Sequence, residues 1–370
     1  MNKPIILPKN DSPDVWARIA SSGLPIYIYG TGNGADRILD VMNAHGITAS
    51  GVFASDGFVR NRVFRGFKVS SYSNVCNECA DFAVVVAFGS SRPEVMANVD
   101  RIAAERTVFC PDVPAVGSTL FDSDFYRENY DKFNAVSELF ADERSREVYS
   151  DIISYKLTGD IYYLNHSAEA DDPANSILNL ERYRSMLDLG AYTGDTVRSA
   201  IENMPKLERI IAVEPEPRAF RKLTEYASSI EKPLIVPVNA AAWDSDTTLN
   251  FTGGTGRGST SDAEGRKSHR GQHSYDVAAL TPDSSAKDFV IDFIKYDVEG
   301  AEARALRGSR CIINKYSPDL LVSLYHRSED LFSLPFLVRE LCPDHKLYLR
   351  RKRGFPAWDI ELYAISEENS

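Results

Sequence analysis

One stretch of the sequence decides the fold, and it reads Met186-Leu187-Asp188-Leu189-Gly190-Ala191-Tyr192-Thr193-Gly194-Asp195-Thr196. Here a short apolar run ends in an acid, and a turn with two glycines follows it. The sequence predicts a helix over Thr196 to Met204, after which a second apolar run ends in the acid Glu214. This order of strand, turn, helix and strand is typical of the first unit of a doubly wound α/β sheet that binds a nucleoside.

The glycine spacing indicates which nucleoside ligand the unit binds. Glycines let the backbone approach a ligand, and Glu214, at the tip of the second strand, can accept hydrogen bonds from a ribose diol. The pattern is Gly190-x-x-x-Gly194 rather than G-x-G-x-x-G, so the tight turn that seats a pyrophosphate is missing. This favours a ligand without phosphates over NAD, and it predicts S-adenosylmethionine as the cofactor.

Five segments agree in order and spacing with a known family. They are D-L-G-A-Y-T-G-D-T, V-E-P-E, V-N-A-A-A-W-D, K-Y-D-V-E-G-A-E and L-V-S-L-Y-H, all in the last half of the chain. Together they resemble the FkbM-type methyltransferase family, and K-Y-D-V-E-G-A-E is the most specific of them. The resemblance implies a class I methyltransferase, with a doubly wound seven-stranded α/β sheet. It also implies methylation of a sugar or natural-product hydroxyl.

The resemblance places the cofactor against the first three strand ends. The first strand and turn would meet its methionine part through Asp188, Gly190, Ala191, Tyr192, Gly194, Asp195 and Thr196. Glu214 would bind the ribose hydroxyls, and Asn239 would contact the adenine edge. Tyr163 and Tyr183 are weaker contact candidates, because segments just before the first strand cap the cofactor in the family.

The catalytic candidates follow two later apolar runs. The strand over residues 290–297 delivers Lys295, Asp297 and Glu299 to its carboxyl end, where ligands bind in open α/β sheets. Alternation along a strand starts Asp297 and Glu299 on opposite faces, unless the chain has already turned. Asp297 is the first choice of general base and His326 the second, with Lys295 pairing with the carboxylates or contacting the substrate. The sequence shows no dense cluster of histidines and acids, so it predicts a reaction without a metal.

Length and composition narrow the classes of protein that fit. The 370 residues allow two domains, and a net charge of -11 argues against a nucleic-acid partner. Five cysteines, including Cys76-x-x-Cys79, do not form a disulfide framework. No apolar run is long enough to span a membrane and the N-terminus has no signal-peptide core, so a cytoplasmic protein is predicted. The basic run Arg350–Arg353 indicates either a solvated hairpin tip or a contact for an anionic substrate group.

Residues 1–115 repeat the α/β pattern independently. A strand over residues 25–29 leads into Gly30-Thr31-Gly32-Asn33-Gly34-Ala35 and a helix, and further strands are expected over residues 51–54, 82–88 and 107–110. This Rossmann-like domain is similar to the N-terminal domain of PglD-type sugar acyltransferases, which receives a nucleotide sugar. Three interpretations stay open: a scaffold that binds nothing tightly, a nucleotide-sugar or substrate-handle site, and a dinucleotide site.

The rest of the chain divides into two further parts. Residues 116–182 are expected to form a helical connector, with one helical spacing from Phe133 to Leu157, and residues 183–370 the methyltransferase domain. Within that domain, Thr252 to Ser274 is predicted to be a mobile loop, either a plain excursion or a substrate lid. A small-molecule or glycan acceptor and a possible homo-oligomer complete the prediction. The alternative is a nucleotide-sugar binding protein with a non-catalytic methyltransferase-like domain.

Overall fold

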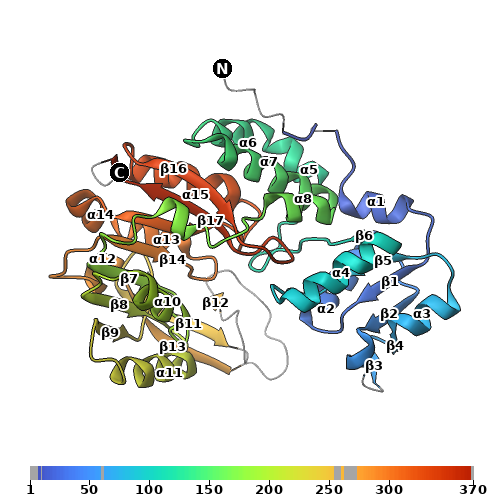
Figure 1. Ribbon diagram of the computed structural model, residues 1–370, viewed down its shortest axis with the longest axis horizontal. Helices are drawn as coiled ribbons and strands as arrows, with labels where there is room; N and C mark the ends of the chain where they lie inside the picture. The colour runs from blue at the N-terminus through green and yellow to red at the C-terminus, as the bar shows by residue number, and fades with distance from the viewer. Residues whose placement is uncertain (1–6, 10, 60–61, 254–259, 262–272, 368–370) are drawn as a thin grey trace.

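The computed structural model describes residues 7–9, 11–59, 62–253, 260–261 and 273–367. Two large sheets lie side by side, with a group of helices above the junction between them (Figure 1). The seven-stranded α/β sheet expected of a class I methyltransferase is present, and a smaller α/β sheet precedes it, so the predicted fold class is confirmed.

The first sheet is built from residues 26–109. Its strands are β1 (Ile26–Tyr29), β2 (Gly51–Ala54), β3 (Val63–Phe64), β4 (Phe67–Ser71), β5 (Ala83–Val86) and β6 (Thr107–Phe109), in the order β3-β4-β2-β1-β5-β6. All pairs are parallel except β3 with β4. Its helices are α1 (Val15–Ser21), α2 (Asn33–Ala44), η1 (Asp56–Phe58), α3 (Tyr72–Glu78) and α4 (Pro93–Glu105). The predicted strand–turn–helix after residue 25 is therefore correct.

A helical segment joins the two sheets. It consists of α5 (Ser123–Glu128), α6 (Tyr130–Ser137), α7 (Glu143–Thr158), α8 (Ile161–Ser167) and α9 (Ala174–Ile177). Helix α7 contacts α1 beside the first sheet and β16 (Lys346–Arg351) of the second. One cluster of buried side chains runs through both sheets and these helices, from Phe53 and Phe82 through Tyr149 to Leu187 and Leu320. The division into three domains therefore stays a prediction, since the apolar core does not stop at its boundaries.

The second sheet has the order β16-β17-β15-β14-β7-β8-β9. Its remaining strands are β7 (Ser185–Leu189), β8 (Arg209–Val213), β9 (Leu234–Val238), β14 (Phe293–Tyr296), β15 (Asp319–Ser323) and β17 (Ile360–Ile365), of which only β17 runs antiparallel to its neighbours. Helices α10 (Asp195–Asn203), α11 (Pro217–Ser228), α12 (Pro282–Ser285), α13 (Glu302–Arg307), α14 (Arg310–Tyr316) and α15 (Asp330–Leu341) connect them. The order reverses between β7 and β14, and ligands bind at the carboxyl ends of strands at such a point.

A small third sheet corrects the expected loop over Thr252 to Ser274. Strand β11 (Thr247–Gly253) pairs with β13 (His273–Leu280), and β10 (Ala241–Ala242) and β12 (Thr260–Ser261) extend the sheet. The ends of β11 and β13 were not predicted, because the sequence there is rich in glycines and short polar residues. The remainder of the predicted loop, residues 254–259 and 262–272, lies outside the described residues.

Two predicted helices are each interrupted. The spacing from Phe133 to Leu157 is divided between α6 and α7, because the Asp142 carboxylate caps a new helix by accepting from the Ser145 N–H at 2.8 Å. The chain before it also donates from Ala141 N to the Leu347 carbonyl of β16 at 2.8 Å. In addition, the sequence predicts a single helix over residues 301–314, but the helix breaks at Gly308, where a Cβ would lie 2.1 Å from the Trp243 carbonyl oxygen.

The basic run Arg350–Arg353 is a solvated hairpin tip only in its second half, where Lys352 and Arg353 are 41% and 53% exposed, and its contact with an anionic substrate group stays a prediction. Arg351 is fully buried and donates to the Leu164 carbonyl of α8, while Arg350 pairs with Asp142 at 2.6 Å. Lys352 pairs with Asp172 at 3.3 Å, and Arg353 pairs with Asp100 of α4 at 2.8 Å. The run fastens the β16–β17 hairpin to the helical segment and to the first sheet.

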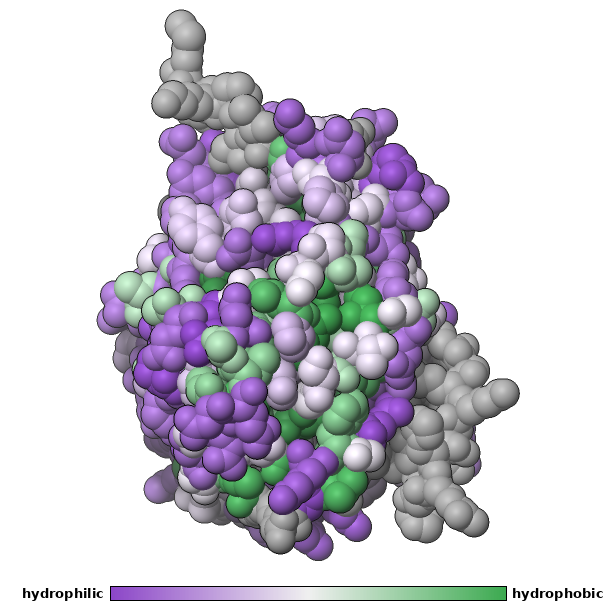
Figure 2. Space-filling view, turned by 90° about the vertical axis from the view of Figure 1, so that its right-hand side faces the viewer, coloured by the Kyte–Doolittle hydropathy of each residue, from purple (hydrophilic) through white to green (hydrophobic). Residues whose placement is uncertain are grey.

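The surface over the first sheet carries both hydrophobic and hydrophilic side chains. From this side, hydrophobic residues occupy the middle of the face and hydrophilic residues border them (Figure 2). Phe58 and Val63, near the sheet edge, are 70% and 69% exposed. Within the described ranges, no helix has the length and apolar character needed to cross a membrane.

Candidate active site

The loop after β7 is shaped by two glycines in the left-handed region. Gly190 has φ +84° and Gly194, the N-cap of α10, has φ +86°. A Cβ on Gly190 would lie 1.9 Å from the Asp297 carbonyl oxygen, so this loop passes directly against the end of β14. Ala191 is buried at its base, and Asp195 and Thr196 form the first turn of α10. The structure thus brings the predicted loop residues to the point where the strand order reverses.

Glu214, at the end of β8, holds this loop in place. Its carboxylate accepts from the Tyr192 N–H and the Glu216 N–H, both at 2.8 Å. Burial raises the pKa of Glu214 to about 7, although these two hydrogen bonds act to lower it. An ionised carboxylate has about four acceptor positions, so two remain for a ribose diol.

Asp188 is the most deeply buried acid of the loop. It is fully buried, and neither carboxylate oxygen accepts a hydrogen bond from any described residue. Lys295 Nζ lies 3.6 Å away, but burial dominates and raises the pKa of Asp188 to about 6. A buried carboxylate with unfilled acceptor positions fits a cationic ligand, and the ammonium of S-adenosylmethionine is such a group.

Asn239 makes backbone contacts beside Glu214 that the sequence did not predict. Its side-chain amide donates to the carbonyls of Glu214 and Pro215 at 2.8 and 3.3 Å. The residue therefore fixes the tip of β8, and its contact with adenine stays a prediction. Tyr183 is wrong as a cofactor contact, because it is fully buried and bonds to Asp319.

Lys295 lies between Asp188, where the cofactor is expected to bind, and Asp297, where the acceptor is expected to bind. Its ammonium lies 3.6 Å from Asp188 Oδ1 and 3.3 Å from Asp297 Oδ2. Burial alone would raise the pKa of Asp297, but the charges of Lys295 and His326 outweigh it and hold that pKa well below its usual range. The Tyr325 hydroxyl also donates to Asp297 Oδ1 at 2.9 Å. Asp297 is therefore an ionised carboxylate with 30% of its side chain exposed.

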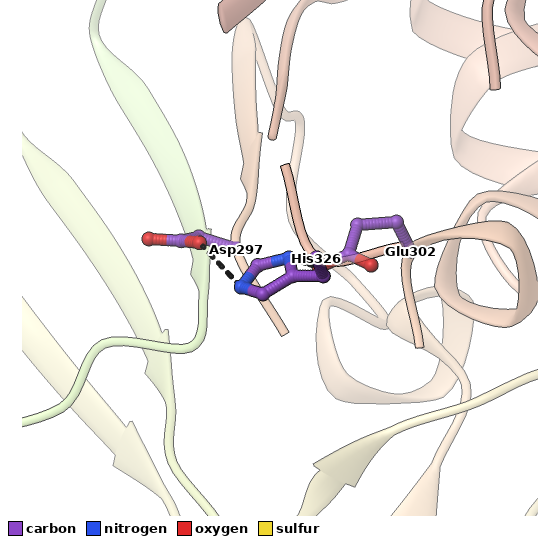
Figure 3. A group of neighbouring side chains, drawn as sticks. All are labelled: Asp297, Glu302 and His326. Atoms are coloured by element: carbon purple, nitrogen blue, oxygen red, sulfur yellow. Dashed lines mark ion pairs between the residues drawn. The ribbon is translucent and has the colours of Figure 1, made fainter. Parts of the chain in front are cut away.

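His326 is fully buried, and its ring lies between Asp297 and Glu302 (Figure 3). Its Nε2 is 3.7 Å from Asp297 Oδ1 and 3.6 Å from Glu299 Oε2, and its Nδ1 is 3.0 Å from Glu302 Oε1. Burial would lower the pKa of His326, but Glu302, Asp297 and Glu299 raise it to about 10. A fully buried, protonated ring cannot itself take a proton from an acceptor, which argues against His326 as the base and leaves Asp297 and Glu299 as the candidates.

Glu299 reaches the same ring because the strand has already ended. Strand β14 stops at Tyr296, and Glu299 adopts a left-handed φ of +53° that is uncommon for this residue type. The turn brings Asp297 and Glu299 to one side of His326, instead of leaving them on opposite faces of the sheet. Glu299 keeps 37% of its side chain exposed.

Glu302 is a site residue that sequence reasoning missed, although it closes the K-Y-D-V-E-G-A-E segment. It is 1% exposed, and its ligand atoms with those of Asp297 and His326 all lie within 4.8 Å of one another. The sequence predicts no such cluster, so that premise is wrong. Glu302 faces Nδ1 while Asp297 faces Nε2, and a protonated ring with two N–H groups suits this arrangement better than a metal ion, which binds one nitrogen.

The segment that leaves the first sheet forms a wall of the site. The Val116 N–H donates to the His326 carbonyl at 3.0 Å, and a Cβ on Gly300 would lie 3.1 Å from the Val116 side chain. Arg37 of α2 holds this segment by donating to the carbonyls of Pro114 and Ala115 at 2.9 and 3.3 Å. Residues outside the second sheet therefore border the Glu299–Gly300 turn.

Comparisons with known proteins agree with this geometry. Residues 188–356 match the family model of the methyltransferase FkbM domain. The crystal structure of methyltransferase FkbM from Methylobacillus flagellatus KT is similar, with a TM-score of 0.69 and 18% identity, over 97% of this chain and 94% of that chain.

Two further solved structures match about half of the chain at low TM-scores. Fibrillarin from Aeropyrum pernix, in complex with natively bound S-adenosyl-L-methionine, has a TM-score of 0.32 and 17% identity over 51% of this chain and 69% of that chain. M. jannaschii TYW2 in complex with AdoMet has a TM-score of 0.29 and 14% identity over 50% and 68%. Among curated proteins, none matches the chain. The chain is thus similar in sequence, over residues 188–356, to the FkbM methyltransferase domain, and similar in fold, over nearly its whole length, to a methyltransferase FkbM.

Proposed function

We propose that the protein is an S-adenosylmethionine-dependent methyltransferase that methylates a hydroxyl of a small-molecule or glycan acceptor. The observation that carries this proposal is Asp188. Its carboxylate is fully buried beneath the glycine loop, and no described residue donates a hydrogen bond to it. Lys295, 3.6 Å away, offsets the cost of this buried charge only in part, and a cationic ligand would offset the rest.

The residues around Asp188 suit the rest of the cofactor. Gly190 and Gly194 let the loop pack closely against the end of β14 and against α11, and Glu214 has two acceptor positions left for a diol. Asp195 and Thr196 begin a helix at the end of the loop. Bound at this edge, S-adenosylmethionine would supply an activated methyl group on its sulfonium.

The acceptor side offers groups that can hold and deprotonate a hydroxyl. Asp297 and Glu299 each expose about a third of their side chain at the end of β14. A carboxylate oxygen of one of them would take the hydroxyl proton as the acceptor oxygen bonds to the methyl carbon and the sulfur–carbon bond breaks. Lys295, 3.3 Å from Asp297, would keep that carboxylate ionised before the reaction, so that it is able to accept the proton.

Calorimetric titration with S-adenosylhomocysteine tests the proposal. We expect saturable binding to the full chain, and Glu214→Ala should weaken it by on the order of 1–3 kcal/mol because two diol acceptors are lost. The matched control is Glu208→Ala, an exposed glutamate before the opposite end of β8, which should leave the affinity unchanged. Absence of binding at millimolar ligand, with the protein folded, would rule the proposal out.

One observation keeps a second candidate open for the first sheet. A Cβ on Gly34 would lie 2.7 Å from the Ala87 carbonyl oxygen, so this glycine allows α2 to pack closely on β5, as a dinucleotide-type turn requires. A nucleotide-sugar site there is a separate proposal. Thermal-shift measurements with nucleotide sugars and with NAD, on the full chain, distinguish the two ligands from a scaffold that binds neither.

A further inference from the structure

Glu302 has no part in the proposed reaction, but it makes two kinds of contact near the site. One carboxylate oxygen accepts from the Val298 N–H at 2.9 Å and from the Gly300 N–H at 3.3 Å. The same oxygen lies 3.0 Å from Nδ1 of His326. The side chain is 1% exposed, so these contacts are made away from solvent.

The two backbone contacts enclose Glu299. Val298 and Gly300 are its neighbours on either side, and both donate to the one Glu302 oxygen. Glu299 itself has φ +53°, a conformation that costs a non-glycine residue roughly 1–2 kcal/mol unless its surroundings hold it. The geometry explains how the strained turn persists, because Glu302 ties both of its ends.

The contact between Glu302 and His326 belongs to a group of carboxylates that surrounds the His326 ring. Carboxylates face this ring from three elements: Asp297 at the end of β14, Glu299 in the turn, and Glu302 on α13. A fourth, Asp330 of α15, is close enough for Glu302 and burial to raise its own pKa well above the usual value. Lys295 lies beyond Asp297 and does not pair with the ring.

We propose that Glu302 is a positioning residue, which holds Glu299 in its left-handed turn and keeps His326 as the cation behind the two acceptor-facing carboxylates. Glu302 does not touch the acceptor, and it acts through Glu299 and His326. The inference rests on the proposed function, because these two residues matter for catalysis only if an acceptor reacts there. The contacts themselves can be tested without cofactor or acceptor.

Substitutions of Glu302 separate its two tasks. Glu302→Gln keeps an oxygen for the two backbone donors but removes the charge beside the ring. Histidine ring resonances of the full chain should then show a pKa of about 10 for His326 in the wild type, and at least one unit lower in Glu302→Gln. Glu302→Ala should lower it similarly and, in addition, speed amide hydrogen exchange at Val298 and Gly300 by more than tenfold.

The control and the contrary outcomes are defined in the same experiment. Glu340→Gln removes an exposed carboxylate on α15 that pairs with Arg310, and it should leave the His326 titration unchanged. An equal His326 pKa in wild type and Glu302→Gln would overturn the electrostatic part, and unchanged exchange in Glu302→Ala would overturn the turn-holding part. Saturable shifts of the ring resonances on adding Mn²⁺ or Zn²⁺ would identify a metal site instead. None of these outcomes depends on whether S-adenosylhomocysteine binds.

Discussion

Asp188 carries a charge that Lys295, 3.6 Å away, compensates only in part. Burial raises its pKa to about 6, so at neutral pH the folded state pays for keeping it ionised. A carboxyl group with a raised pKa stabilises the fold only while it is protonated, and that contribution is lost as the pH rises through about 6. A cationic ligand would pair with this same charge. Ionisation of Asp188 should therefore lower the stability of the ligand-free fold and raise the affinity for the ligand.

Asp188→Asn should therefore have two effects of opposite sign. At pH 7.5 the ligand-free protein should gain up to about 3 kcal/mol in its free energy of unfolding, because a shift of one pKa unit corresponds to about 1.4 kcal/mol. The affinity for S-adenosylhomocysteine should fall at least tenfold. Denaturant unfolding and calorimetry measure the two quantities. A variant that is both less stable and equally tight in binding would contradict the assignment.

The acids of the cofactor side also predict a dependence of binding on pH. Glu214 and Asp188 have pKa values of about 7 and about 6, and both must be ionised to accept from the diol and to pair with the ammonium. Protons therefore compete with the ligand below pH 7, and S-adenosylhomocysteine should bind at least tenfold more weakly at pH 5 than at pH 8. Titrations at the two pH values check this, and Asp188→Asn should show a smaller loss.

At this scale, the sequence predicted where the acids lie but not what surrounds them. Asp188, Glu214 and Asp297 end apolar runs, and the ends of parallel strands meet at one sheet edge, so their gathering follows from the pattern. The burial of His326 does not follow, because its ring is surrounded by Asp297, Glu299 and Glu302 from another segment of the chain. Glu302 was overlooked because its partners are backbone N–H groups, which no residue pattern marks.

Among the elements, the β7–α10 loop has the least freedom to vary. Gly190 combines a positive φ with a Cβ position 1.9 Å from the Asp297 carbonyl oxygen. Its backbone and that of β14 are therefore packed with no room for a side chain.

Gly190→Ala should destabilise the fold by roughly 2–5 kcal/mol and abolish cofactor binding, because either the loop or the end of β14 must move. Gly46→Ala is the matched control, since Gly46 has φ +69° and nothing within 4 Å of its Cβ position. It should lose only about 1–2 kcal/mol, the cost of the left-handed backbone. Thermal unfolding compares the two, and equal losses would show that the close approach is not rigid.

Helix interruptions show why element boundaries were harder to predict than element types. The apolar spacing continues from Phe133 to Leu157, so periodicity alone gives one helix. The break is decided by Asp142, which caps α7, and by a backbone bond to β16, which is distant in the sequence. Likewise, the break at Gly308 depends on the Trp243 carbonyl that lies against it.

For the whole molecule, one continuous apolar cluster joins the two sheets and the helices between them. Buried Arg351 strengthens this union by donating from β16 to the Leu164 carbonyl of α8. We therefore expect the full chain to unfold in a single calorimetric transition. Arg351→Met should lower its temperature without splitting it, since Leu164 loses a buried donor worth about 1–3 kcal/mol. Two separated transitions in either protein would show that the sheets unfold independently.

The contact between Val116 and His326 has a consequence for how the acceptor preference of such a chain would change. The match to the family model begins at residue 188, yet residues some seventy positions earlier border the carboxylates proposed to react and are tethered by Arg37 of the first sheet. The region that matches the family model is therefore shorter than the set of residues that form the site. Under the proposed function, substitutions around Val116 would change acceptor preference while the segments that match the family model stayed intact. A trimmed catalytic fragment that starts at the family border would lack that wall.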